Sequence, residues 1–124
     1  MSGMQPVTKN NLSQREKMTK RNKRAVCKDG FSMSVQASKT KYCKPRIDNA
    51  NQYIEVEVGY PNQMEDLLMD WCEDKNRPCD TVYGYVPATL VSLVITKHGG
   101  LVEGEVPNGV LLYDSASKAI IEPR

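Results

Sequence analysis

Aromatic residues and long hydrophobic runs are scarce in this sequence. Phe, Trp and Tyr make up 6% of the 124 residues, with a single Phe and a single Trp, so the core is expected to be aliphatic. No run of about 18 apolar residues occurs, which excludes a membrane-spanning helix. The first residues include no apolar segment of the kind found in secretory signals. We therefore expect one domain that stays in the cytoplasm.

The sequence also lacks the spacings of common metal, phosphate and catalytic sites. Its four cysteines, Cys27, Cys43, Cys72 and Cys79, include no CxxC pair, and His98 is the only histidine. Structural zinc sites generally need paired ligands at short spacing, so free thiols are favoured over a metal site or disulfides. Neither GxxxxGK[ST] nor GxGxxG occurs. A Cys43–His98 pair would lack a third, orienting group. We expect no enzyme, no cofactor and no metal.

The charges divide the chain into two unlike parts. Residues 1–46 contain twelve Lys or Arg and two acids, whereas residues 47–124 contain five Lys or Arg and thirteen acids, which gives +10 and −8. This asymmetry favours an anionic partner for the first part, or pairing between copies in a homo-oligomer. Neutralisation of the two parts within one folded chain is the alternative.

Periodicity predicts an α+β fold, with a mainly antiparallel sheet and two helices packed on one face. Alternating apolar and polar residues predict the strands, and two apolar stripes predict the helices. Strands precede helices without a regular βαβ order, which favours this class. The expected strands are 25–27, 31–37, 53–58, 81–86, 101–106 and 110–113. The expected helices are 62–74 and 87–98.

Capping signals mark the ends of both expected helices. Asn62 is expected to cap the first helix, with Glu65 completing a capping box. The second helix is expected to begin at Pro87 and to end at Gly99. Leu93 is expected to widen the buried stripe of this second helix. In both helices the apolar stripe would cover the sheet.

Three regions follow from composition. Residues 1–24 form a flexible basic arm, 25–113 a compact domain and 114–124 a C-terminal tail. Within the arm, Ser13 and Glu16 have the spacing of a capping box, so its second half is a candidate helix. With no apolar face to bury, we expect it to order only on a partner or not at all.

The segment 25–37 is expected to form a hairpin that turns at Asp29–Gly30, a favoured two-residue turn. Apolar residues define the inward face of its second strand: Phe31, Met33, Val35 and Ala37. The opposite face carries only uncharged polar groups: Ser32, Ser34, Gln36 and Ser38. An exposed strand face without any charge is unusual, so this face is a candidate contact surface.

This polar face leads into the basic loop SKTKYCKPR. Tyr42 lies among its cations and is suited to stack on a base, and Arg46 is suited to grip a phosphate with two hydrogen bonds. A small nucleotide or a single strand fits such a set, and a solvated basic loop is the alternative. The expected ligand-binding residues are Ser34, Gln36, Ser38, Lys39, Tyr42, Lys44 and Arg46.

Tyrosines provide a second candidate surface. Strand 53–58 is expected to turn Tyr53 outward and Ile54 inward. Tyr83 and Tyr85, two residues apart, are expected on the same side of an extended segment. We expect Tyr53, Tyr83 and Tyr85 to contact a partner. Together with Tyr60 these make four tyrosines, and with so few aromatics two of the four are expected to be mostly buried.

Several strings resemble a set of small, uncharacterised proteins encoded by tailed bacteriophages. They are DGFSMSVQAS, YCKPR, YIEVEVGYP, VYGYVP and KHGG, and they span roughly residues 27–105. The resemblance implies a phage protein in the host bacterial cytoplasm, and it carries over no site residue. Small phage proteins without catalytic motifs commonly act by binding. The expected function is to counter a host defence, by occluding an effector protein or by sequestering a small nucleotide signal. Nucleic-acid binding through the basic arm and the 39–46 loop is the alternative.

Overall fold

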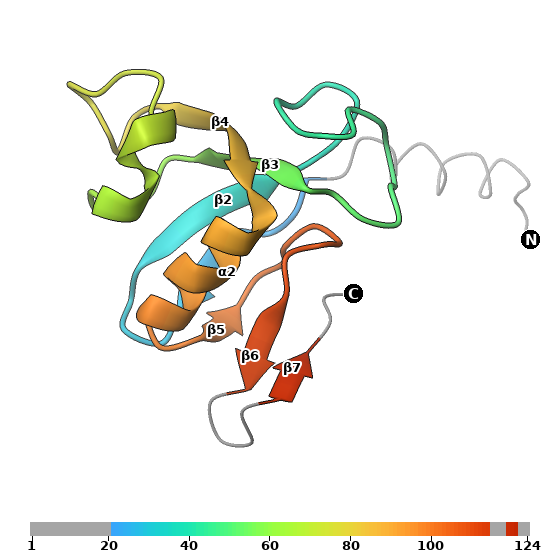
Figure 1. The fold of residues 1–124 in the computed structure, drawn as a ribbon. Helices are drawn as coiled ribbons and strands as arrows, with labels where there is room; N and C mark the ends of the chain where they lie inside the picture. The colour runs from blue at the N-terminus through green and yellow to red at the C-terminus, as the bar shows by residue number, and fades with distance from the viewer. Residues whose placement is uncertain (1–20, 115–118, 122–124) are drawn as a thin grey trace, which may run out of the picture.

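A computed structural model describes residues 21–114 and 119–121 of the chain. Five strands form an antiparallel sheet in the order β4-β3-β2-β1-β5, and β6 and β7 form a separate hairpin. The strands are β1 (Ala25–Cys27), β2 (Ser32–Gln36), β3 (Glu55–Gly59), β4 (Val82–Pro87), β5 (Leu101–Glu103), β6 (Leu112–Asp114) and β7 (Ala119–Ile121). The helices are the 3-10 helix η1 (Asp66–Trp71) and α2 (Ala88–Lys97). The expected α+β class is confirmed (Figure 1).

The expected hairpin of β1 and β2 forms, but its turn is not the expected two-residue turn at Asp29–Gly30. The Gly30 N–H donates to the Cys27 carbonyl at 2.9 Å, so Lys28 and Asp29 are the central turn residues and Gly30 follows as a third loop residue. The carboxylate of Asp29 accepts a hydrogen bond from the backbone of Phe31 at 2.9 Å, and Gly30 supplies a φ of 97°. The inward residues Phe31, Met33 and Val35 are fully buried. Burying each of these side chains contributes about 1.5–3 kcal/mol to folding. This hairpin therefore supplies much of the aliphatic core.

Helix α2 crosses one face of the sheet (Figure 1). Its buried stripe contains Val91, Val94 and Ile95, and the positive φ of Gly99 lies just beyond its last residue, as expected. Pro87 lies at the cap position, one residue before the helix. The expectation for Leu93 is wrong, because its side chain is 52% exposed. Leu93 is two residues from Val91, which places the two on opposite sides of a helix of 3.6 residues per turn.

The expected helix over 62–74 is wrong in length and in type. Only six residues, those of η1, are helical, and Glu65 caps them by accepting from the backbone N–H of Leu67. Asn62 instead binds the β1–β2 hairpin, because its backbone and amide exchange hydrogen bonds with Ser32 and Gly30 at 2.9 Å. The chain bends at Asn62, and the helix starts only after it.

The start of β3 also differs from the alternating pattern. Tyr53 is 4% exposed and Ile54 is 52% exposed, the reverse of the expectation. Both residues precede β3 and pair with other segments, Tyr53 with Asn108 and Ile54 with Lys44. Alternation across a strand therefore does not extend back to them.

The C-terminal region contains a hairpin. The expected strand 110–113 is observed as β6, and β7 pairs with it within the region expected to be a loose tail. The candidate helix in the arm lies almost entirely outside the described residues, and residues 21–24 are not helical.

Candidate binding surface at the 38–46 loop

The uncharged face of β2 is covered by the chain itself. Gln36 is 5% exposed, and its side chain exchanges two hydrogen bonds with the backbone of Asn22, at 2.8 and 2.9 Å. The Gln36 amide also donates to Ser34 Oγ at 3.0 Å, and the Asn22 amide donates to the Val35 carbonyl at 3.1 Å. Both polar atoms of Gln36 are therefore used within the fold, contrary to the expectation that it contacts a ligand.

Arg24 supplies the charge that this strand face lacks. Its Nε donates to Ser32 Oγ at 2.9 Å, and its Nη2 donates to the carbonyls of Ser32 and Tyr60. The polar side chains of β2 thus contact residues 22–24, and Arg24 brings a positive charge to a strand face that has no charged residue of its own.

The loop after β2 is fixed to β3. The backbone N–H of Lys44 donates to Glu55, and the Lys44 carbonyl accepts from Ile54, at 2.9 and 2.8 Å. The Glu57 carboxylate accepts from the backbone N–H of Tyr42 at 2.9 Å. These contacts tie the loop to the first half of β3, so its side chains project from a fixed backbone.

Hydrogen bonds within the loop hold its other end. Ser38 Oγ accepts from the Thr40 backbone at 3.2 Å, and the Ser38 carbonyl accepts from the buried Cys43 thiol at 3.1 Å. The Asp48 carboxylate accepts from the backbone of Lys39 at 3.1 Å. The hydroxyl of Ser38 therefore serves the loop, whereas the Lys39 side chain is exposed.

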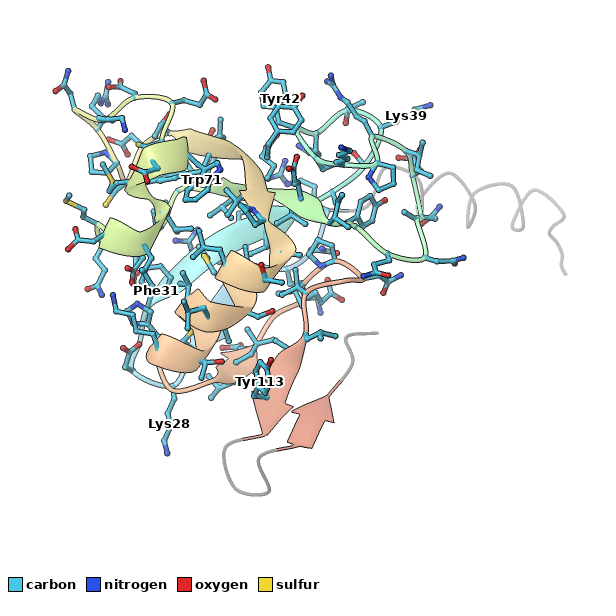
Figure 2. All side chains as sticks on the ribbon, viewed as in Figure 1. Lys28, Phe31, Lys39, Tyr42, Trp71 and Tyr113 are labelled. Atoms are coloured by element: carbon cyan, nitrogen blue, oxygen red, sulfur yellow. The ribbon has the colours of Figure 1, made fainter. Side chains whose placement is uncertain are left out.

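Two tyrosines and an arginine meet on this loop and form what we call the tyrosine–arginine patch: Tyr42, Arg46 and Tyr85. The ring centroids of Tyr42 and Tyr85 lie 5.9 Å apart, and the Arg46 guanidinium lies 5.4 Å from the centre of the Tyr42 ring. Tyr42 and Tyr85 are 43% and 45% exposed. Figure 2 shows Tyr42 and Lys39 extending outward from the molecule.

The cations around the patch are not neutralised. Among residues 21–114 and 119–121, no ion pair involves any of the four loop cations Lys39, Lys41, Lys44 and Arg46. The nearby acids Asp48 and Glu57 accept hydrogen bonds from backbone N–H groups instead. A third acid lies close to the patch, since a Cβ at Gly84 would be 3.1 Å from Tyr42 Cβ and 3.6 Å from a Glu73 carboxylate oxygen. The patch is therefore aromatic and carries Arg46, and the other loop cations share its surroundings with acids.

A β-bulge separates the two tyrosines of β4. Val86 pairs with Val56 and Tyr83 pairs with Val58, which leaves two residues of β4 opposite Glu57. The bulge changes the alternation, so Tyr83 is buried while Tyr85, with a φ of 57°, reaches the surface. The expectation that both lie on one side is wrong.

Only one of the three expected partner-binding tyrosines is available. The hydroxyls of the buried Tyr53 and Tyr83 donate to the carbonyls of Ile47 and Pro78, both at 2.7 Å. These two residues are structural, contrary to the expectation of partner contact. Tyr60 and Tyr85 are exposed, so the expectation that two of these four tyrosines are buried is confirmed.

An ionic cluster that sequence reasoning missed lies at the end of α2. The two ring nitrogens of His98 contact the carboxylates of Asp29 at 2.7 Å and Glu65 at 2.6 Å. Lys97 donates to the other oxygen of Glu65 at 2.8 Å, and the ring of Phe31 stacks on His98 at 4.2 Å. The sequence indicated only a histidine suited to the helix C-terminus, because both carboxylates come from distant segments.

The carboxylates hold His98 in its charged form. Burial lowers the pKa of His98, but its hydrogen bonds to Glu65 and Asp29 outweigh burial and raise that pKa overall. Burial raises the pKa of Glu65, but its hydrogen bonds, first that from Lys97, leave it lowered. The pKa of Asp29 is lowered by the hydrogen bond from the Phe31 backbone and by His98. This cluster joins three segments, and its groups are paired with one another.

The cysteines are free thiols, and their environments differ. Only Cys79 is exposed. Burial, aided by the charge of Asp29, raises the pKa of Cys27 to about 11, and burial also raises the pKa of Cys43. The Cys43 thiol bonds to backbone carbonyls and His98 bonds to carboxylates, so these two do not form a catalytic pair.

Three further findings bear on the class of protein. In residues 21–114 and 119–121, no group of three His, Cys, Asp or Glu side chains is placed to hold a metal ion. None of the helices in this described part has the length and apolar character needed to span a bilayer. Comparisons with protein-family models, with curated proteins and with solved structures gave no match.

Proposed function

We propose that this chain is a non-enzymatic bacteriophage accessory protein that counters a host defence by occluding an acidic surface of a host effector protein. The observation that carries the proposal is the tyrosine–arginine patch, in which Tyr42 and Tyr85 are exposed and Arg46, which makes no ion pair among the described residues, lies over the Tyr42 ring. The phage setting rests on the resemblance of the strings quoted above.

The composition and rigidity of the patch support a protein partner. Tyrosine and arginine are enriched among the residues that dominate binding energy at interfaces. The backbone of Tyr42 is bonded to Glu57 and Tyr85, so little conformational freedom is lost when the patch is covered. The surrounding lysines would favour acidic surfaces and accelerate encounter with them.

The geometry gives less support to the capture of a small nucleotide. Small molecules generally bind in concave sites, whereas the patch projects from the surface. The polar groups of Gln36 are used by Asn22, and the Tyr42 ring is already flanked by Arg46 and Tyr85. For a base to stack between the rings of Tyr42 and Tyr85, the two rings would have to be separated by about twice a single stacking distance. Their centroids are only 5.9 Å apart.

A matched pair of variants tests the proposal. Tyr85→Gly and Tyr60→Gly each remove an exposed tyrosine with a positive φ, 57° and 51°, and comparable exposure, 45% and 48%. The tagged wild-type chain and both variants would be expressed in bacteria that carry defence systems, and captured proteins would be identified by mass spectrometry. The same strains would be scored for phage plating.

We expect one effector to co-purify with the wild type and with Tyr60→Gly, and to be lost with Tyr85→Gly and Arg46→Ala. Protection of phage plating should be lost in parallel. Equal capture by all four chains would refute the patch as the binding site. Calorimetric titration with cyclic and linear nucleotides covers the other mode, because saturable binding abolished by Arg46→Ala would favour sequestration instead.

A second candidate function, nucleic-acid binding, is favoured by the position of residues 21–24, the described end of the basic arm. The arm enters the fold at Asn22, which contacts Gln36 at the end of β2, directly before the basic loop. Arg21 and Lys23 are exposed at this entry. Binding should then weaken steeply from about 50 to 200 mM salt, and removal of residues 1–20 should reduce the salt slope. Affinity that is insensitive to salt and to this deletion would exclude it.

A further inference from the structure

Two of the four cysteines, Cys72 and Cys79, lie against the same side chain, that of Tyr83. They stand at the two ends of the surface loop between η1 and β4. Cys72 is buried, with 8% of its surface exposed, and Cys79 is exposed. We propose that this pair of thiols is a modification site, at which hydrogen peroxide closes a reversible disulfide bond between Cys72 and Cys79.

The backbone places Cys72 beside Tyr83. The two residues form an isolated antiparallel bridge, and directly opposed side chains of such a pair project from the same face. The next residue continues the pairing, since the Glu73 N–H donates to the Val82 carbonyl at 3.1 Å. The Cys72 thiol and the Tyr83 ring therefore extend in the same direction from the edge of the sheet.

The far end of the Tyr83 ring holds Cys79 in place. The Tyr83 hydroxyl donates to the carbonyl of Pro78, the residue before Cys79, at 2.7 Å. Standard peptide dimensions then place the Cys79 Cα within about 5.5 Å of that hydroxyl oxygen. The pKa of Tyr83 reflects both neighbours, because burial raises it and the Cys72 and Cys79 thiols raise it further. The two cysteines thus converge on one hydroxyl.

The loop between the cysteines folds back on itself in two successive turns. The Arg77 N–H donates to the Asp74 carbonyl and the Asp80 N–H donates to the Arg77 carbonyl, both at 3.0 Å. The residues between the cysteines are exposed, apart from the half-buried Pro78. A loop with so few buried contacts can shift without disturbing the core, which allows the two Cα atoms to adopt the spacing of about 4.4–6.8 Å that a disulfide needs.

The reaction has two steps and consumes one hydrogen peroxide. The exposed Cys79 is oxidised first: its sulfur attacks a peroxide oxygen, the O–O bond breaks, and a sulfenic acid and one water form. The Cys72 sulfur then attacks the sulfenic sulfur. The S–S bond forms as the S–O bond breaks, and hydroxide leaves with the Cys72 proton as a second water. The two thiols lose two electrons to the peroxide, and an added dithiol restores them.

The second step is the slower one. Cys72 is buried, and its thiol donates to the Asp74 carbonyl at 3.3 Å. This contact must break before the Cys72 sulfur can reach Cys79. Rapid reaction with thiol reagents is therefore expected at Cys79 alone, and closure of the disulfide follows more slowly.

Peptide mapping of the full chain tests the proposal. The chain would be treated with hydrogen peroxide, its remaining thiols alkylated, and the product digested with trypsin and analysed by mass spectrometry. Trypsin separates the two cysteines, because it cuts after Lys75 but not after Arg77, which precedes proline. We expect peptides 47–75 and 76–97 to be joined by a disulfide, with a loss of two hydrogen masses, and to separate after treatment with dithiothreitol.

Cysteine variants assign the order of the steps. In Cys72→Ser the sulfenic acid at Cys79 has no thiol to meet, so dimedone, which traps sulfenic acids, should label Cys79 in this variant and much less in the wild type. In Cys79→Ser the linked peptides should be absent.

A matched pair of tyrosine variants tests the positioning by Tyr83. Tyr83 and Tyr53 are both buried, and each hydroxyl donates to a backbone carbonyl at 2.7 Å. Tyr83→Phe removes the hydroxyl that holds Pro78, so closure should slow about two- to tenfold and labelling by dimedone should rise. Tyr53→Phe removes an equivalent hydrogen bond elsewhere and should close at the wild-type rate.

Three outcomes would overturn the inference. The first is oxidation of Cys79 in the wild type without the linked peptides. The second is a disulfide that joins the Cys79 residues of two chains in their place. The third is an equal rate of closure in Tyr83→Phe and Tyr53→Phe. The first two are measured on the wild-type chain, so the test does not depend on the folding of a variant.

Discussion

The Nε2 atom of His98 lies 2.6 Å from Oε1 of Glu65, and both side chains are almost wholly buried. The other ring nitrogen contacts Asp29 at 2.7 Å. A neutral imidazole has one donor and one acceptor nitrogen, so only the imidazolium donates to two carboxylates at once. The end of α2 is therefore held by a buried cation shared between the β1–β2 turn and the residue that caps η1.

This arrangement predicts a stability optimum at mildly acidic pH. Because the pKa of His98 is raised, its contribution is fully present below the unfolded value of about 6.5 and is lost as pH rises through the folded value. Because the pKa values of Asp29 and Glu65 are lowered, their contributions are present above about pH 4 and are lost on further acidification. Urea unfolding between pH 3 and 9 should show the maximum between about 4.5 and 6.5.

Replacement of His98 tests the origin of the alkaline decline. His98→Ala should lower the free energy of unfolding at pH 6 by about 3 kcal/mol, because it removes one partner of a buried ionic cluster. It should also flatten the decline from pH 6 to 9. Lys97→Gln, which alters the neighbouring, half-exposed member, should keep the decline. The same slope in His98→Ala as in the wild type would contradict the assignment.

The hydrogen bonds that hold residues 22–24 against β2 should protect this segment from proteolysis. Gln36→Leu should release Asn22 and leave its backbone groups unpaired, at a cost of about 1–3 kcal/mol. Limited trypsin digestion should then cut after Lys23 and Arg24 faster than in the wild type. Ser34→Ala, which removes only the acceptor for the Gln36 amide, should have a smaller effect. Equal cleavage rates for the wild type and both variants would show that the contacts with β2 do not hold residues 22–24.

Two glycines with nearly equal φ angles separate backbone strain from steric collision. Gly30 and Gly104 have φ values of 97° and 96°, but an added Cβ meets nothing within 4 Å at Gly30 and would lie 2.0 Å from the Arg24 carbonyl oxygen at Gly104. Gly30→Ala should cost about 1–2 kcal/mol, the penalty for a positive φ. Gly104→Ala should cost clearly more, measured by urea unfolding. Equal losses would mean that the chain relaxes around the Arg24 contact.

The thiols should differ in reactivity. Titration of the native chain with an aromatic disulfide at pH 8 should give one rapid equivalent, from Cys79, because the other three cysteines are buried. The raised pKa of Cys27, about 11, further suppresses its thiolate at this pH. Cys79→Ser should remove the rapid phase, and denaturant should expose the remaining three. More than one rapid thiol in the native chain would contradict the burial described.

Local patterns predicted local structure well. The β1–β2 hairpin depends on a three-residue turn over Lys28, Asp29 and Gly30 and on residues within a dozen positions, and α2 depends on its own stripe and end signals. The failures involve partners far away in sequence. Nothing near Asn62 indicates that its side chain will bind Ser32 instead of capping a helix, and nothing near Tyr83 indicates that an extra residue opposite Glu57 will change the alternation.

The candidate site could be predicted only in part, because some of its contacts also come from segments distant in sequence. A basic loop with an interleaved tyrosine is visible in the sequence, and Tyr42, Arg46 and Tyr85 do meet. The pattern of β2 indicates an exposed polar face, but Asn22 and Arg24 cover that face. These two residues reach it only because β1 pairs with β2, which the local sequence does not reveal.

The position of β1 has a consequence for synthesis of the chain. This strand lies between β2 and β5, and the residues before it continue the contact, with Lys23 bonded to Glu105 across 82 positions. During translation the first strand therefore waits with one edge open until nearly all of the domain has left the ribosome. Nascent chains stalled before residue 101 should carry an unpaired edge on β1. Addition of β5 closes this edge and should protect the sheet from chaperone recognition and aggregation.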